Sequence, residues 1–515
     1  MKKRFMIALC CLVLLMQLLP VVPMAETTST ATVDKGTVAQ DLYYCRVELA
    51  KMPNGQALVA AYDRIVAGIN ECATEIEIEL SEEEFRLVLD ATRRDHTEQF
   101  WMDSGYSTVA SEDDDSFIVT MQPQYTMTGV QLADAKVAFE QATRSILARL
   151  TPDMSQYEME KALHDMLAVQ VDYVTGAPNA HNAYGALVEN QAVCEGYAES
   201  LQYLLQRVGI QSVEVLGSSI NPSTQKQENH AWNIVRIDGE YYLIDLTWDD
   251  QGKSRFLSYA YFNQTTAVFE NDHVQWTVGY ENGETSACII DLPLCNATVE
   301  NYYIKNNLVV GDYDVQSIGT LLKNNDLAVW LFIDSDVNAF IDWFHNSYEA
   351  VAVVAGAKDP WTANIIGIGN EVYLEFSVKC EHKHTQLVEA VSATCEQDGN
   401  IAYYVCQNKN CGKWFADAEA QSYIITHDIV NVFSMGHTWV RKEEEAALLE
   451  GETYWYTCSA CGTLSDTFSF GPEPEETFDF GSILDFLLEN PIILGGGGGS
   501  VLLIVIIALI RKARG

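Results

Sequence analysis

Residues 195–208, directly after Cys194, have a helical pattern of hydrophobic positions. The apolar positions of this segment are Ala198, Leu201, Leu204, Leu205 and Val208. Their spacing places them on one face of a helix, and Gly209 is typical of the residue that ends one. Cys194 is therefore predicted at or just before the helix N-terminus. The free N–H groups and the helix dipole there favour a thiolate and could hold a developing oxyanion.

Two apolar segments after this helix alternate in a way that predicts a β-hairpin. The segments HAWNIVRI and EYYLIDLTW flank Asp238-Gly239, a dipeptide typical of two-residue turns. With such a turn, Ile237 would pair with Glu240. The register of every other pair in the hairpin then follows from the sequence.

This register brings a histidine and an aspartate close together. His230 would pair with Thr247, and Asp245 would pair with Trp232. Residues two apart share a face of a strand, so His230 and Asp245 would be diagonal neighbours with Cα atoms roughly 7–8 Å apart. An imidazole and a carboxylate at that separation can form a hydrogen bond. The approach of Cys194 to His230 does not follow from the register.

Cys194, His230 and Asp245 are the candidate catalytic residues. A thiol, an imidazole and a carboxylate can act as nucleophile, base and orienting group for the base. Each residue alone has a commoner structural explanation, since a cysteine before an amphipathic helix is usually a small buried hydrophobe. The hairpin register favours the catalytic interpretation of the His–Asp pair.

The sequence around these residues resembles the transglutaminase-like superfamily. The matching segments are NAYGALVENQAVCEGYAESLQYLLQRVGI at 182–210 and HAWNIVRIDGEYYLIDLTWDD at 230–250. The resemblance implies Cys194 as the nucleophile, His230 as the base and Asp245 as the orienting carboxylate. It also implies a papain-like arrangement of helices and strands.

Residues beside the three candidates contribute to the same resemblance. These residues are Gly196, Tyr197, Trp232, Asn233, Thr247, Trp248 and Asp249. The preceding YEMEKALHDMLAVQVDYV resembles the helix that leads into such a core, whereas Gln191-Ala192 replaces a glycine often found just ahead of the nucleophile. The implied fold class is α+β, with a papain-like transglutaminase core at residues 151–275.

Two further regions are predicted on either side of this core. Residues 26–150 are expected to be mostly helical, with Ser81-x-x-Glu84 as a capping box. Residues 276–379 contain short β-like runs and predict an accessory α/β or β-rich domain. Within this domain, DSDVNAFIDWFHNSYEAVAVVA is expected to form a helix and then a strand.

Residues 380–470 contain two related units rich in cysteine and histidine. HTQLV at 384 recurs as HTWV at 437, and a C-x4-C pair in the first unit corresponds to a C-x2-C pair in the second. The candidate ligands are Cys380, His384, Cys395, Cys406, Cys411, His437, Cys458 and Cys461. Such residues predict two small zinc modules, but disulfides compete for the same thiols outside the cell. The sequence leaves structural zinc, disulfides and free thiols open.

The two ends of the chain predict its location. Residues 1–25 combine a basic start, an apolar run and a small residue at a plausible cleavage site, as a secretory signal peptide does. Residues 492–510 are uncharged and precede a basic tail at 511–515, which predicts a transmembrane helix with a cytoplasmic end. The acidic, proline-containing residues 471–491 are expected to be a linker. These features are typical of a single-pass bacterial surface protein with an extracellular catalytic body.

Charge excludes one class of partner. The chain has 515 residues, too many for one core, and its 72 acidic against 31 basic residues give a formal net charge of −41. A phosphate backbone would be repelled, and no long basic patch is present, so no nucleic-acid partner is expected. The expected partners are a peptide or protein substrate outside the cell and the chain's own membrane.

The predicted function is that of an extracellular thiol enzyme acting on peptide or protein amides through a thioester. Hydrolysis is favoured over cross-linking, although both share the first half-reaction. No cofactor is required for this chemistry, and zinc would have only a structural role. The alternative is a non-catalytic surface adhesin or scaffold with the same fold. An enzyme acting on cell-wall peptides would differ from the first hypothesis only in its substrate.

Overall fold

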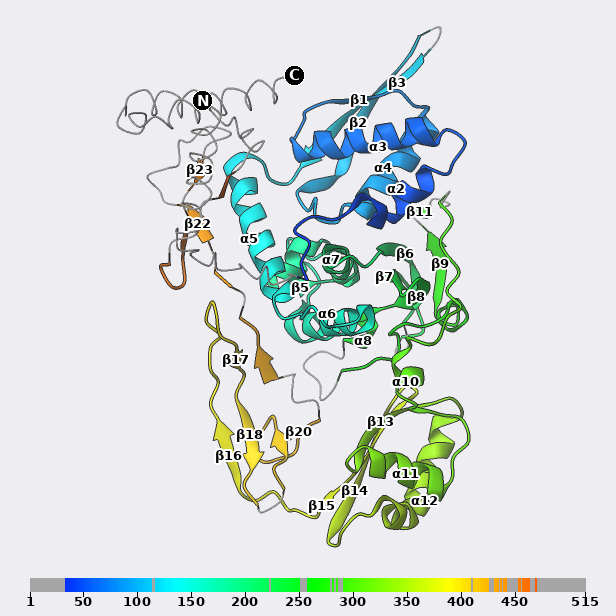
Figure 1. Cartoon of the computed structure of the whole chain (residues 1–515), viewed down its shortest axis with the longest axis vertical. Helices are drawn as coiled ribbons and strands as arrows, with labels where there is room; N and C mark the ends of the chain where they lie inside the picture. Colours follow the sequence, from blue (N-terminus) through cyan, green and yellow to red (C-terminus); the bar gives the residue numbers. More distant parts are fainter. Residues whose placement is uncertain are drawn as a thin grey trace, which may run out of the picture. The chain divides into compact units, whose positions relative to one another are not determined.

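The computed structural model of the chain is shown in Figure 1. It describes residues 33–469 except 114–115, 222–223, 251–256, 278–279, 282–283, 286–289, 409–410, 426–429, 435, 438, 442–452, 455 and 464–467. The predicted signal peptide, linker, transmembrane helix and cytoplasmic tail lie outside the described residues. Among the helices that the structure describes, none combines the length and the apolar character needed to cross a membrane. The chain divides into two compact units, Met1–Thr438 and Trp439–Gly515.

The N-terminal region combines helices with a three-stranded antiparallel sheet. Its helices are η1 (Gln40–Leu42), α2 (Tyr44–Leu49), α3 (Gly55–Asn70), α4 (Glu82–Asp95) and α5 (Gly129–Leu147). Its strands, in the order β1-β3-β2, are β1 (Ile76–Ile78), β3 (Ser116–Tyr125) and β2 (Met102–Asp113). The predicted capping box is present, because the Ser81 side chain accepts from the Glu84 N–H and the Glu84 side chain accepts from the Ser81 N–H. The sheet was not predicted from the sequence.

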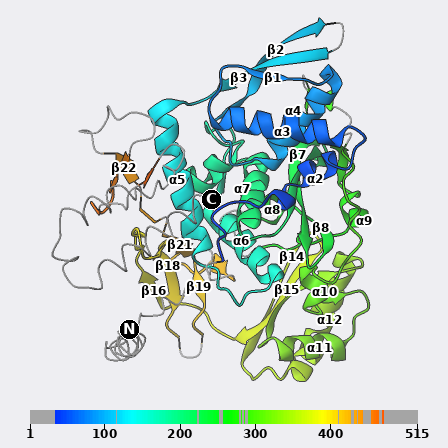
Figure 2. The same cartoon turned by 45° about the horizontal axis from the view of Figure 1, so that its top comes forward.

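The next region packs helices against a four-stranded antiparallel sheet of order β8-β7-β6-β9. The strands are β6 (Ser212–Ile220), β7 (Gln227–Ile237), β8 (Glu240–Ile244) and β9 (His273–Thr277). The helices are α6 (Gln156–Gln170), the π-helical η2 (Gly185–Glu189), α7 (Cys194–Arg207), α8 (Leu246–Asp249) and α9 (Thr266–Phe269). Two short parallel strands, β4 (Asp172–Tyr173) and β5 (Gln191–Ala192), lead into α7. Helix α7 contacts α6 and the strands β6 and β7 (Figures 1 and 2).

The helix predicted after Cys194 is confirmed as α7. Its side chains Leu201, Leu204 and Leu205 are 0% exposed and belong to one hydrophobic core, which extends from Tyr44 to Cys295. That core includes residues of both the N-terminal region and the four-stranded sheet. Burial of this apolar face therefore holds α7, and the cysteine at its start, against the sheet.

The hairpin prediction is correct near the turn and wrong at its far end. Ile237 pairs with Glu240, but β8 ends at Ile244 and the next residues form the one-turn helix α8. His230 pairs with Gly217 of β6 and not with Thr247. The side chain of Asp245 accepts from the Trp248 N–H at 3.1 Å and caps α8. This local hydrogen bond competes with strand pairing and ends the hairpin.

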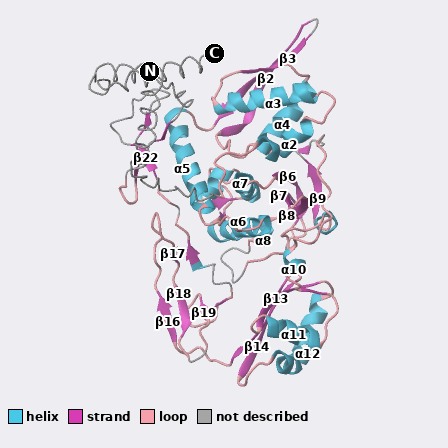
Figure 3. Ribbon diagram, viewed as in Figure 1, coloured by secondary structure: helices cyan, strands magenta, loops and turns pink. Residues whose placement is uncertain are grey.

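The accessory region has its own core and a four-stranded sheet of order β12-β13-β15-β14. The strands are β12 (Val309–Val310), β13 (Ala328–Ile333), β14 (Trp361–Ile368) and β15 (Glu371–Val378). The helices are α10 (Tyr302–Lys305), α11 (Val315–Asn324) and α12 (Val337–Ala355), of which α11 and α12 cover one face of the sheet (Figure 3). A strand was expected at the end of the α12 segment, and this was wrong. The helix continues because Val351, Ala352 and Ala355 pack in the core.

The remaining described strands are short. A small hairpin of β10 (Tyr280–Glu281) and β11 (Glu284–Thr285) precedes the accessory region. The first Cys/His unit contains β16 (Thr385–Val388), β17 (Gly399–Asn400), β18 (Tyr403–Cys406), β19 (Trp414–Phe415), β20 (Tyr423–Ile424) and β21 (Asn431–Val432). The second compact unit contains β22 (Trp439–Arg441), β23 (Thr453–Tyr454), β24 (Tyr456–Cys458) and β25 (Phe468–Ser469).

A buried carboxylate joins the accessory region to the four-stranded sheet region. Glu371, the first residue of β15, is 2% exposed. It accepts hydrogen bonds from the Ser258 hydroxyl at 2.6 Å and from the Tyr259 N–H at 3.1 Å, and the Tyr303 hydroxyl also donates to it. Burial raises the pKa of Glu371, and the hydrogen bonds oppose this effect. A carboxylate buried with three donors is costly to disturb, so it fixes this junction.

The junction can be tested by the substitution Glu371→Ala. It should lower the free energy of unfolding by about 2–4 kcal/mol, because it removes three hydrogen bonds and leaves buried hydroxyl groups without an acceptor. Urea denaturation of the full chain measures this change. Glu349→Ala, at an exposed position of α12, is the matched control and should change stability by less than about 0.5 kcal/mol. Equal effects of the two substitutions would contradict the proposed role of Glu371.

Candidate active site

The backbone before α7 fixes the position of Cys194. Cys194 is the first residue of the helix, Val193 is its N-cap, and the Val193 N–H donates to the Ala180 carbonyl at 2.9 Å. A Cβ atom on Gly196 would lie 2.5 Å from the same Ala180 oxygen, so only glycine fits there without a shift of the backbone. The glycine thus allows the first turn of α7 to approach this segment closely. The partly buried Cys194 is held where the first N–H groups of the helix have no intrahelical partner.

The structure brings the three candidate residues together. His230, on β7, donates from Nε2 to Oδ2 of Asp245 at 2.7 Å, and the two side chains are 6% and 0% exposed. The thiol of Cys194 interacts with the His230 ring and raises its pKa. Because Nε2 is engaged by Asp245, Nδ1 is the ring nitrogen left for the thiol. The His–Asp contact arises at the end of β8, where Asp245 also caps α8, and not within an extended hairpin.

The electrostatics of the pair favour a charged imidazole. Burial alone would lower the pKa of His230, but the charge of Asp245 and the hydrogen bonds to Asp245 and Cys194 raise it to about 10. Burial alone would raise the pKa of Asp245, but His230 and His273 hold it well below its usual range. The pair is therefore an imidazolium and a carboxylate at neutral pH.

A second histidine, which the sequence analysis did not select, contacts the same aspartate. His273 is 0% exposed and donates from Nε2 to Oδ2 of Asp245 at 3.1 Å, while its Nδ1 lies 2.7 Å from Oδ1 of Asp272. Its ring is surrounded by Trp232 at 4.8 Å, Trp248 at 4.7 Å and Phe269 at 4.4 Å between ring centroids. The position follows from the pairing of β9 with β6, which are distant in sequence. A single sequence contains no local signal for such a pairing.

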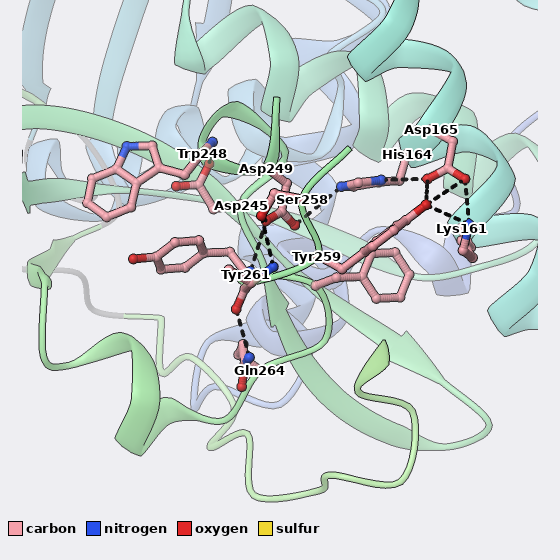
Figure 4. Close-up of polar contacts among 12 residues, drawn as sticks. Lys161, His164, Asp165, Asp245, Trp248, Asp249, Ser258, Tyr259, Tyr261 and Gln264 are labelled. Carbon is pink, nitrogen blue, oxygen red and sulfur yellow. Dashed lines mark hydrogen bonds and ion pairs between the residues drawn. The ribbon is translucent and has the colours of Figure 1, made fainter. Parts of the chain in front are cut away.

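A third buried histidine lies behind the site (Figure 4). His164, on α6, has Nε2 at 3.3 Å from Oδ2 of Asp249 and Nδ1 at 3.0 Å from Oδ1 of Asp165. Burial alone would lower the pKa of His164, but these two carboxylates raise it to about 9. His164 therefore links α6 to the end of α8. Burial raises the pKa of Asp249 to about 7, so the imidazolium meets a carboxyl group that is only partly ionised at neutral pH.

The same aspartate connects the site to the accessory region. Oδ1 of Asp249 accepts from the Tyr261 N–H at 2.9 Å and lies 3.2 Å from the oxygen of the Ser258 hydroxyl (Figure 4). The Ser258 hydroxyl also lies within hydrogen-bond distance of Glu371. A continuous line of polar contacts thus runs from Glu371 through Ser258 to Asp249, at the end of the turn that Asp245 caps.

The first Cys/His unit contains a group of side chains that could bind a metal ion. The ligand atoms of Cys380, His382, Cys406 and Cys411 lie within 4.8 Å of one another. His384, which the sequence analysis placed in this set, lies outside it and is exposed. The left-handed backbone at His382, with φ of 49°, turns the chain just before β16, so that His382 and not His384 faces the cysteines.

The other four candidate ligands lie in two pairs. Cys395 and His437 have ligand atoms within 4.8 Å of each other in the first compact unit. Cys458 and Cys461 are equally close in the second compact unit. The turn between these two cysteines is tight, since the Gly462 N–H donates to the Cys458 carbonyl at 2.9 Å.

Comparisons with known proteins concern the region of the candidate site. Residues 144–246 match the family model described as transglutaminase-like superfamily. The kyphoscoliosis peptidase of Mus musculus is 32% identical over 93 residues, which cover 16% of this chain and 14% of that protein. The Homo sapiens kyphoscoliosis peptidase is 31% identical over 93 residues, with the same coverage. The chain therefore spans about one seventh of the length of these relatives.

Solved structures with some similarity include a transglutaminase and a proposed cysteine protease. The transglutaminase is 14% identical with a TM-score of 0.20, and the match covers 36% of this chain and 53% of that one. The proposed protease, from Cytophaga hutchinsonii, is 13% identical with a TM-score of 0.18, and the match covers 28% and 62%. On the family match, residues 144–246, which contain Cys194, His230 and Asp245, are a domain of the transglutaminase-like superfamily.

Proposed function

We propose that the chain is a thiol enzyme that cleaves peptide or protein amides, with Cys194, His230 and Asp245 as its catalytic residues. The observation that carries this proposal is the buried His230–Asp245 pair at 2.7 Å, whose imidazole also interacts with the thiol of Cys194 at a helix N-terminus. Burying two charges costs several kcal/mol unless their attraction and further hydrogen bonds offset it. Apolar side chains would fill the same space at lower cost, so the pair favours a catalytic role.

The geometry supports the following acylation step. The imidazolium of His230 holds a proton at Nδ1, and the sulfur of Cys194, as the thiolate paired with it, attacks the carbonyl carbon of the substrate amide. The N–H groups of the first turn of α7 stabilise the oxyanion. The carbon–nitrogen bond then breaks as the imidazolium returns its proton to the leaving amine, which leaves a thioester on Cys194. Asp245 keeps Nε2 protonated, so that Nδ1 is the nitrogen that exchanges the proton.

The second half-reaction determines whether the enzyme hydrolyses its substrate or cross-links it to an amine. Water, deprotonated by His230, would add to the thioester carbon and release the acid with the Cys194 sulfur as leaving group. An amine in place of water would give a cross-link by the same route. We favour hydrolysis, since a relative that matches this region is named a peptidase. These steps use no cofactor, and a zinc ion in the Cys/His units would be structural.

The proposal includes the location and the partners expected from the sequence. A signal peptide at residues 1–25 and a transmembrane helix at 492–510 would hold the catalytic body outside the cell, at its own membrane. Its substrate there would be a peptide or a protein. The net charge of −41 argues against nucleic acid as a substrate.

We assign His273 a positioning role within this proposal. Its Nε2–H shares Oδ2 of Asp245 with His230, at 3.1 Å and 2.7 Å respectively, while the Trp248 N–H binds Oδ1. These three donors fix both carboxylate oxygens. The groups that face His273 are Asp272, Asp245, His230, Trp232, Trp248, Tyr261 and Phe269. His273 therefore acts on the reaction through the position and the charge of Asp245.

The proposed function predicts an unusual pH dependence of alkylation at Cys194. Because His230 holds its proton up to about pH 10, a thiolate–imidazolium pair should form well below that pH and be lost as the pH rises through it. Iodoacetamide should therefore modify Cys194 of the full chain at about pH 5.5. In His230→Ala the rate at that pH should fall on the order of 100-fold. Mass spectrometry of the cysteine peptides measures each site separately.

Cys72 serves as an internal control in the same experiment. It is partly buried, and burial raises the pKa of its thiol. Its alkylation should therefore require alkaline pH and should not change in His230→Ala. If Cys194 and Cys72 show the same pH profile, Cys194 has no working base and the proposed function is wrong.

The positioning role of His273 predicts a shift in the same profile. His273→Leu removes a donor that holds the pKa of Asp245 down, so Asp245 should take up a proton at higher pH. The acid limb of the profile, where the rate of Cys194 alkylation falls as the pH is lowered, should then move to higher pH. His273→Gln retains an N–H donor and should move the limb less. A loss of stability with an unchanged acid limb in both variants would show that His273 is merely structural.

A further inference from the structure

We propose that Cys380, His382, Cys406 and Cys411 bind a structural zinc ion that fixes the first Cys/His unit to the accessory region. Three thiols and one imidazole converge here, with all ligand atoms within 4.8 Å of one another. This set contains His382 in place of the histidine expected from the sequence. The inference does not depend on the proposed catalytic function.

The distances between the ligand atoms match tetrahedral zinc. Sγ of Cys380 lies 3.6 Å from Sγ of Cys406, and Sγ of Cys411 lies 3.4 Å from Nδ1 of His382. With zinc–sulfur bonds of about 2.3 Å and a zinc–nitrogen bond of about 2.0 Å, tetrahedral geometry gives roughly 3.8 Å and 3.5 Å. A disulfide needs about 2.05 Å between sulfur atoms, so Cys380 and Cys406 are not bonded to each other. Four side chains are thus preorganised around a space of the size of one ion.

The sulfur and nitrogen atoms of the ligands indicate zinc as the bound metal. Thiolates and imidazole suit zinc, whereas calcium and magnesium require oxygen ligands. A set of three cysteines and one histidine fills all four positions and leaves none for water, as in structural zinc sites. Two hydrogen bonds already support one thiolate, because the His382 N–H and Nδ2 of Asn408 donate to Sγ of Cys380 at 3.3 Å and 2.9 Å.

The ligands come from two segments that the ion would hold together. Cys380 and His382 follow β15, the last strand of the accessory sheet, which continues directly into β16 (Figure 1). Cys406 ends β18, and Cys411 lies in the turn towards β19. The Cys406 N–H donates to the Lys413 carbonyl at 2.9 Å and closes this turn. Zinc would therefore connect the exit of the accessory sheet to the β18–β19 turn.

A buried ion pair beside the cluster joins the same two parts. Nζ of Lys413 lies 2.7 Å from Oε2 of Glu375, and their side chains are 10% and 9% exposed. The Tyr423 hydroxyl donates to Oε1 of Glu375 at 3.1 Å. Glu375 belongs to β15, whereas Lys413 and Tyr423 belong to the first Cys/His unit. A unit of this size has a marginal core of its own, and a metal ion at the junction would supply the missing stability.

Two neighbouring histidines provide a matched test of the site. The full chain and the variants His382→Ala and His384→Ala are purified without chelator, and zinc is measured by inductively coupled plasma mass spectrometry. We expect His382→Ala to contain about one zinc ion fewer per chain than the parent, because it removes a ligand. His384→Ala should contain as much zinc as the parent, since His384 is exposed and outside the cluster. The comparison between variants cancels any zinc bound elsewhere in the chain.

The variant His382→Cys guards against a loss of zinc that is due only to misfolding. Four cysteines also form a zinc site, so this variant should retain the ion and, after exchange with Co²⁺, show the absorption of a tetrahedral cobalt–thiolate site. Equal zinc contents in His382→Ala and His384→Ala would overturn the proposal. So would a disulfide between Cys380 and Cys406 in the purified chain, or a different metal at the site. Alkylation at Cys194, measured on the same samples, reports on the catalytic proposal separately.

Discussion

The hydrogen bond between His230 and Asp245 is the interaction on which the rest of the site depends. Both side chains are buried, so their charges are stable only while further donors satisfy the carboxylate. His273 and the Trp248 N–H provide these donors. His273 lies on β9, which pairs with β6, and Trp248 lies in α8, which Asp245 caps. The cap that ends β8 brings the Trp248 N–H to Asp245, and the pairing of β9 with β6 brings His273 to it.

Local patterns in the sequence were enough to predict the elements that carry the candidate residues. The helix after Cys194 and the pairing of Ile237 with Glu240 both follow from spacing and turn chemistry within about fifteen residues. The errors arose where another interaction outweighed the local pattern. A side-chain cap replaced the strand expected after Ile244. Tertiary packing of Val351 and Ala352 kept α12 helical despite its valines.

Contacts between distant segments could not be predicted in this way. His273 reaches Asp245 only because β9 pairs with β6, more than fifty residues earlier in the chain. The repeat in the sequence pointed to His384 as a ligand, but the left-handed backbone at residue 382 turns the chain so that His382 faces the cysteines. Such choices depend on the course of the backbone in three dimensions. For this reason His273 and His382 were identified only from the structure.

The junction at Glu371 has a consequence for how this architecture can evolve. Its carboxylate meets Ser258 and Tyr259, which lie on the same segment that reaches Asp249 behind the candidate site. Exchange of the accessory region by recombination would leave these groups without their acceptor, unless the incoming domain brought a carboxylate to the same place. The accessory region and the region of the candidate site are therefore expected to be inherited together. Compensating substitutions are expected at the interface between them.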